Sequence, residues 1–100
     1  MPELTVIYWR DIPAQVKATA GRASARRQLS DRFQQAIDAA AMKAGLVGMD
    51  AYLDGWRNET RPCGDDLEQE VAGEAARLEA AFTRDVLRAL IRSAGRRAER

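Results

Sequence analysis

The chain has 100 residues, of which 46% are hydrophobic and 31% charged, a length and composition typical of one globular domain with a modest core. The net charge of +1 provides no overall field that would attract nucleic acid or a membrane surface, so neither is expected as a partner. Because there is no histidine and only one cysteine, an internal disulfide and the common zinc sites are excluded, and we expect no metal and no cofactor.

The N-terminus does not resemble a targeting segment. Met1 is followed directly by Pro2 and Glu3, and the apolar run Leu4–Trp9 is too short for the core of a signal peptide. No stretch elsewhere approaches the length of a membrane span. We therefore predict a cytoplasmic protein whose cysteine remains a free thiol.

Residues 4–20 have the pattern of two paired strands. Leu4–Trp9 is rich in β-branched and aromatic residues, and Pro13 follows it as a break. Val16, Ala18 and Ala20 then alternate with polar residues, which predicts a half-buried second strand paired with the first. Residues 22–29 are ambiguous: they either extend the sheet to residue 29 as a third strand or begin the next helix.

Two helices are expected next. Ser30 is suited to cap a helix over residues 31–44, whose apolar residues recur at helical spacing until Gly45. Asp50 can cap a short helix over residues 50–57, and the segment 58–64 that follows, which contains Pro62, is predicted to be a loop.

The final helix is predicted to be long, over residues 65–94. Asp65 or Asp66 can cap its start, and several arginines near its end match the negative end of the helix dipole. Such a helix would span about 40 Å, whereas a chain of this length has an expected radius of gyration of about 13 Å. It should therefore bend at Gly73 or project beyond the domain toward a partner. The expected core comprises Val6, Tyr8, Phe33, Ile37, Leu78 and Phe82.

These elements predict an α+β fold, a single domain over residues 1–100 in which a two- or three-stranded antiparallel sheet packs with about three helices, the last one long. One segment combines basic side chains without local counter-charge, since no acidic residue lies between Asp11 and Asp31. It is a candidate site for an anion or an acidic partner, and a solvated basic edge of the sheet is the alternative interpretation. Its basic residues are Lys17, Arg22, Arg26 and Arg27.

Cys63 is the one candidate nucleophile. It precedes the predicted last helix and lies two residues from Arg61, and both features lower a thiol pKa. Asp65 and Asp66 have the opposite effect, and no histidine is present to act as a base. Cys63 is therefore either a reactive thiol or a loop residue that fills space.

Several segments resemble a family of small proteobacterial proteins described as virulence factors, after a domain that is also found in a larger conserved virulence factor of Gram-positive bacteria. The resemblance covers roughly residues 3–90 and is carried by LTVIYWRDIPAQV, AGRASARRQLSDRFQQAIDAAAMKAG, DAYLDGW and PCGDDLE. The family has no defined catalytic motif, and the resemblance implies an association with folate- and corrinoid-dependent methyl-transfer enzymes.

We therefore expect a small accessory or adaptor protein rather than an enzyme. It would bind another protein through the long C-terminal helix or the sheet edge, and a homo-oligomer is a further possibility. One alternative is a small anion-binding module that uses Arg22, Arg26 and Arg27, and another is a thiol enzyme that uses Cys63.

Overall fold

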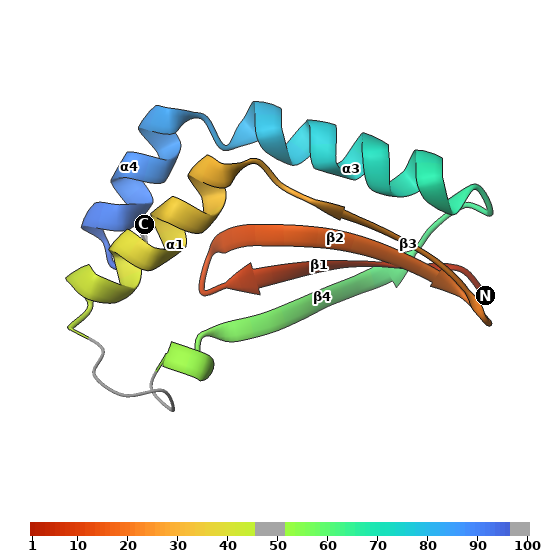
Figure 1. The fold of residues 1–100 in the computed structure, drawn as a ribbon, viewed down its shortest axis with the longest axis horizontal. Helices are drawn as coiled ribbons and strands as arrows, with labels where there is room; N and C mark the ends of the chain where they lie inside the picture. Colours follow the sequence, from red (N-terminus) through yellow and green to blue (C-terminus); the bar gives the residue numbers. More distant parts are fainter. Residues whose placement is uncertain (46–51, 97–100) are drawn as a thin grey trace.

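The computed structural model describes residues 1–45 and 52–96, in which four strands form one antiparallel sheet and three helices pack beside it (Figure 1). The α+β class is therefore confirmed, with more strands than the predicted two or three. In chain order the elements are β1 (Glu3–Trp9), β2 (Ile12–Ala20), β3 (Ala23–Gln28), α1 (Asp31–Lys43), β4 (Trp56–Pro62), α3 (Leu67–Ala81) and α4 (Arg84–Arg92). None of the helices in these ranges is long and apolar enough to cross a membrane.

The strands are ordered β3-β2-β1-β4, so β3 and β4 form the two edges of the sheet. In the register, Val6 lies opposite Val16, and Leu4 lies opposite Ala18. These apolar residues share one face because side chains alternate along a strand. A bulge between Ile7 and Tyr8 shifts the pairing of β1 with β2, whereas β1 and β4 pair without interruption.

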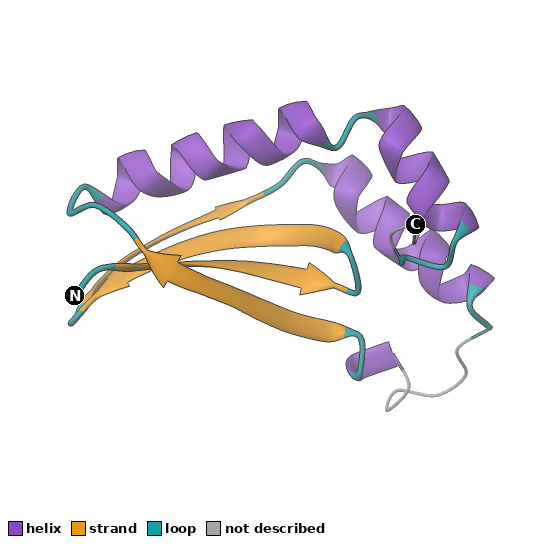
Figure 2. Cartoon of the chain, turned by 180° about the vertical axis from the view of Figure 1, so that it is seen from behind, coloured by secondary structure: helices purple, strands orange, loops and turns teal. Residues whose placement is uncertain are grey.

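The helices cover one face and one end of the sheet (Figure 2). Helix α3 lies along β2 and β3, while α1 packs against α4 and reaches β2. Of the six predicted core residues, five are buried, whereas Tyr8 is half-buried, with the guanidinium of Arg57 over its ring. The core prediction is therefore wrong for Tyr8.

Trp9 is the largest fully buried side chain. Its indole stacks on Tyr52 with ring centroids 5.7 Å apart and donates a hydrogen bond of 2.8 Å to the Tyr52 carbonyl oxygen. Gly55 and Gly95 approach the ring so closely that a Cβ atom at either position would lie under 3 Å from it. The ring thereby joins β1 to the residues that follow α4.

The fourth strand corrects two predictions. Residues 22–29 do extend the sheet, as β3. Residues 56–62, however, form β4, where a helix over 50–57 and a loop over 58–64 were expected. All of β4 except Trp56 is exposed, so its polar residues show no alternation, and the strand exists because its backbone pairs with β1 along its whole length. Residues 50 and 51 lie outside the described residues.

The single helix predicted over residues 65–94 is also wrong. Asp66 does cap α3, accepting a hydrogen bond from the Gln69 amide, but the helix ends at Ala81 rather than bending at Gly73. Thr83 then caps α4 by accepting a hydrogen bond of 3.3 Å from the Val86 amide. Neither helix is especially long. The break turns α4 back onto α1 instead of letting it project, and the radius of gyration is 14.2 Å.

Helix α1 starts at a contact that sequence patterns do not reveal. Ser30 precedes it but forms no side-chain cap. Instead its amide and its hydroxyl both donate to the Glu79 carboxylate, at 2.7 and 2.9 Å. Arg32 pairs with the same carboxylate at 3.0 Å. The beginning of α1 is thereby held against the end of α3.

Candidate functional site

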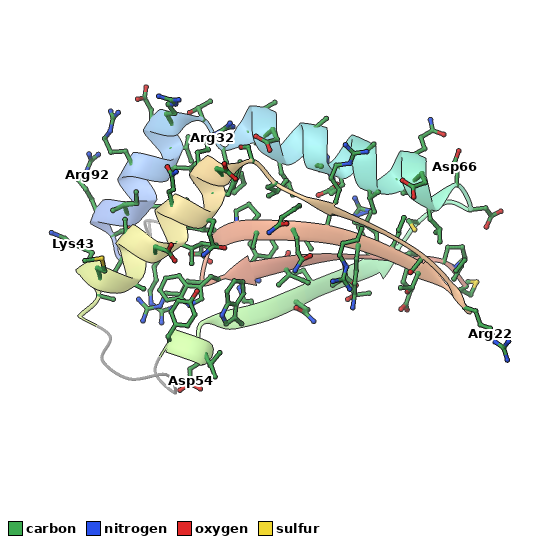
Figure 3. The ribbon with its side chains drawn as sticks, viewed as in Figure 1. Arg22, Arg32, Lys43, Asp54, Asp66 and Arg92 are labelled. Atoms are coloured by element: carbon green, nitrogen blue, oxygen red, sulfur yellow. The ribbon has the colours of Figure 1, made fainter. Side chains whose placement is uncertain are left out.

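The four predicted basic residues do not converge. Lys17 lies opposite Arg26, so both point to the face of the sheet away from α3, whereas Arg27 lies opposite the buried Val16 on the other face. Arg22 lies in the turn between β2 and β3, at the tip of the molecule in Figure 3. Within the described residues these four side chains form no ion pair, so the segment provides one adjacent pair of cations rather than a cluster.

Cys63 follows β4 and is half-buried. Its thiol donates a long hydrogen bond of 3.5 Å to the Gly64 carbonyl oxygen. Burial raises the pKa of the Cys63 thiol, the nearby Glu70 carboxylate raises it further, and the opposing effect of Arg61 is smaller. The thiolate is the nucleophilic form of cysteine, so this environment disfavours the reactive state.

A charged cleft between α3 and β4 was not predicted. The Glu74 carboxylate is only 8% exposed and pairs with Arg61 at 2.7 Å and with Arg77. The cleft has a volume of about 300 Å³, and Leu4 and Val6 form part of its floor. Because Arg61 comes from the strand that was expected to be a loop, no pattern in the sequence places it near Glu74.

A second charged cluster lies farther along β4. Arg57 pairs with Asp11 at 3.2 Å and with Glu59, and its guanidinium lies 4.5 Å from the centre of the Tyr8 ring. Burial lowers the pKa of Arg57, but the hydrogen bonds and charges of Glu59 and Asp11 outweigh this and raise it above the ordinary value. Both clusters are largely balanced by their own charges, and no group of residues suited to a metal ion is found in residues 1–45 and 52–96.

A groove between α1 and α4 has a different character. Its volume is about 410 Å³, and it combines an apolar floor with an arginine-rich rim. Leu87 and Ala36 in its floor are buried, and Ile91 is half-buried. We call this feature the helical groove, and it is lined by Arg32, Gln35, Ala36, Ala39, Arg84, Leu87, Arg88 and Ile91.

The arginines in and beside the helical groove differ in whether a carboxylate neutralises their charge. Arg32 is bound to Glu79, whereas Arg88 forms only an exposed contact of 3.3 Å with Asp85. Arg84 and Arg92 have no ion pair within the described residues. Arg84, Arg88 and Arg92 are spaced four residues apart, so they lie on one side of α4. From the sequence these arginines were expected only to complement the helix dipole.

Comparison with known protein families establishes the family of this chain. A family described as virulence factor matches residues 7–91 of the 100 residues.

The chain belongs to the virulence factor family.

No curated protein and no solved structure matches it. The part of the chain that matches the virulence factor family includes both walls of the helical groove and the whole of β4. The family description concerns a phenotype and names no reaction, so the function has to be inferred from the surfaces of the molecule.

Proposed function

We propose that this protein is an accessory protein that binds a partner protein in the helical groove, and that the bound segment is an acidic amphipathic helix. The observation that carries the proposal is an apolar floor beside two arginines of α4: Arg84 forms no ion pair within the described residues, and Arg88 forms only an exposed one with Asp85. A helix that lays its apolar side into a groove is a common mode of peptide recognition.

The dimensions of the groove fit this kind of ligand. Helix α4 has nine residues and is therefore about 13 Å long, enough for two turns of a bound helix. Leu87 and Ile91 would contact its apolar side chains, and Arg84 and Arg88 would contact its carboxylates. Met42, which is exposed, lies on the same side of α1 as Gln35 and Ala39, next to the groove.

Charge gives the groove a preference. Arg84 in the groove, and Arg92 two turns further along α4, form no ion pair within the described residues, so a segment rich in Asp and Glu would gain ion pairs that the free protein lacks. Arginine suits this role because its planar guanidinium binds carboxylates at two points. A basic segment would meet like charge and be rejected.

The two alternative functions have less support. The anion-binding module would need Arg22, Arg26 and Arg27 to share a site, and they lie in a turn and on opposite faces of the sheet. The thiol enzyme would need a lowered thiol pKa at Cys63, where burial and Glu70 raise it. An adaptor requires neither, and the family resemblance suggests enzymes of folate- and corrinoid-dependent methyl transfer as the first partners to test.

A synthetic peptide can test the groove directly. The probe is a short helical peptide with leucines at i, i+4 and i+7 and glutamates beside them, and its binding is followed by fluorescence anisotropy. Replacing both Arg84 and Arg88 with Glu should weaken binding by about tenfold or more, since ion pairs become repulsions. Ala39→Trp, which fills the floor of the groove, should weaken it as well.

A matched control separates a specific groove from general electrostatic attraction. Replacing Arg22 and Arg26 with Glu changes the net charge by the same amount outside the groove: Arg22 lies at the opposite end of the molecule from Arg32 and Arg92 (Figure 3), and Arg26 lies on β3. This variant should bind the peptide as the parent does. Equal losses in the two double variants would refute the groove, and a thermal shift by inorganic phosphate that only the Arg22/Arg26 variant loses would favour the anion-binding module.

A further inference from the structure

We propose that two copies of this chain associate through the edge strand β4, which pairs with β4 of the second copy in antiparallel fashion with Asn58 opposite Asn58. The proposal concerns a different surface from the helical groove and does not depend on what that groove binds. It rests on the backbone groups and the charges of β4.

The outer edge of β4 carries backbone groups that pair with no strand in the described part of the chain. Antiparallel ladders alternate between hydrogen-bonded and non-hydrogen-bonded pairs. The Arg10 amide donates to the Gly55 carbonyl at one end of the β1–β4 ladder, and the Cys63 amide donates to the Pro2 carbonyl at the other. Every second residue from Gly55 onward, namely Arg57, Glu59 and Arg61 in β4, therefore points its backbone amide and carbonyl groups toward β1.

The intervening residues point theirs outward: these are Trp56, Asn58, Thr60 and Pro62. Within residues 1–45 and 52–96 no strand pairs with this side of β4. An exposed row of this kind is a template for a further strand. The incoming strand must bond to Trp56, Asn58 and Thr60, because Pro62 has no amide hydrogen to donate.

The order of charges along β4 is complementary to that of a second, antiparallel β4. With Asn58 opposite Asn58, Arg57 of each copy lies opposite Glu59 of the other, in a non-hydrogen-bonded pair whose side chains are close together. Arg57 and Glu59 already contact each other within one chain. The four charges would therefore form a square in which every adjacent pair has opposite signs.

Neighbouring registers are less favourable. With Glu59 opposite Glu59, like charges would face each other, and Arg57 would lie opposite Arg61. With Thr60 opposite Thr60, Asn58 would lie opposite Pro62, and a hydrogen bond would be lost at each end. Charges on an edge strand usually repel other strands, but here their order matches that of a second, antiparallel copy.

The geometry of the whole molecule permits this pairing. In Figure 1, β4 runs along the lower edge of the sheet, whereas α1 and α4 pack together at the upper left, so a second copy at β4 leaves the helical groove open. The dimer would contain a continuous eight-stranded sheet, since each copy contributes four strands. It would also present two grooves, which raises the avidity for a partner with two acidic helices.

Sedimentation velocity over a concentration series tests the proposal with complementary charge variants. Arg57→Glu alone and Glu59→Arg alone each place like charges opposite each other and should raise the dimer dissociation constant by about tenfold or more. An equimolar mixture of the two variants restores opposite charges in every pair between the two strands, although positions 57 and 59 of each chain then carry like charges. The mixture should therefore form a heterodimer with an affinity near that of the parent homodimer.

Two further variants serve as controls. Arg26→Glu makes the same charge change on β3, the opposite edge of the sheet, and should leave the dimer unchanged. Asn58→Pro removes an outward amide while leaving the β1 ladder intact, so it should yield a folded monomer even if the Arg57 variant, which also loses its contact with Asp11, fails to fold. A parent protein that is monomeric at all concentrations, or a dimer that Asn58→Pro leaves unchanged, would overturn the proposal.

Discussion

Replacing Phe82 with alanine should lower the free energy of unfolding by about 3–5 kcal/mol. Phe82 is 5% exposed and lies between α3 and α4, where its ring is tilted at 57° to that of Phe33 with centroids 6.2 Å apart. Three terms make up this decrease: the lost free energy of burying the ring, the cost of the cavity left behind, and the lost contact with the Phe33 ring. The ring–ring contact alone contributes about 0.5–1.5 kcal/mol. No buried polar group loses its partner, because Arg32 donates to the backbone oxygen of Phe82.

The effect is large relative to the whole molecule. A domain of this size is typically stable by about 5–15 kcal/mol, and 1 kcal/mol corresponds to about 4–8 °C in Tm. Phe82→Ala should therefore lower the Tm by more than about 10 °C. Urea unfolding followed by tryptophan fluorescence measures the change, since Trp9 is fully buried in the folded chain.

Two controls accompany this variant. Phe82→Leu retains most of the buried volume and should cost about 1 kcal/mol. Val86→Ala, at an exposed position of α4, should change stability by about 0.5 kcal/mol or less. If Phe82→Ala unfolds together with the parent protein, then this ring does not hold α4 against α1, and the helical groove loses its structural basis.

Three other outcomes are expected. Gly73→Ala should stabilise the protein by up to about 1 kcal/mol in urea unfolding, because Gly73 lies inside α3 and an added Cβ meets no atom within 4 Å; a loss of stability would contradict this. Replacing Arg26 and Arg27 with Gln should leave the Tm nearly unchanged, since neither forms an ion pair in the described part of the chain, and a large decrease in a calorimetric scan would indicate a structural role. Alkylation of Cys63 should be slower near pH 8 than that of a model thiol and reach half its maximum rate at a higher pH, whereas Glu70→Gln should move that half-maximum to a lower pH. Because the pKa of Cys63 is raised in the folded chain, the protonated thiol contributes stability that is complete below its unfolded pKa of about 8.5. That contribution is lost as the pH rises through the folded pKa.

The sequence predicts best those strands and helices in which apolar residues recur at the spacing of a strand or a helix. Val16 and Ala18 mark the buried face of β2, and Phe33, Ile37 and Ala40 mark the buried side of α1. These patterns result directly from burial of one face, which is why they can be recognised without the structure. The cap at Asp66 is a local feature of the same kind, since it depends on residues three positions apart.

What could not be predicted depends on contacts between distant segments. The polar strand β4 has no buried face of its own and is stabilised by its ladder with β1, more than 40 residues earlier in the chain. The buried Glu74 resembles an ordinary surface residue, because its spacing with Arg77 is that of an exposed ion pair on a helix. Its second partner, Arg61, could be found only by placing β4 beside α3.

The break at Thr83 changes what the arginines of the last segment can do. In one continuous helix, Arg84, Arg88 and Arg92 would extend into solvent, where isolated charges attract acidic partners weakly and without a defined geometry. Because α4 folds back on α1, Arg84 and Arg88 border an apolar floor formed by both helices, and Arg92 follows one turn beyond them. The proposed partner would gain apolar burial and ion pairs at one place, and the apolar contact would fix where its carboxylates lie. The function proposed for the end of the chain therefore depends on Thr83. This residue caps α4, although the apolar repeat continues across it and predicts one helix.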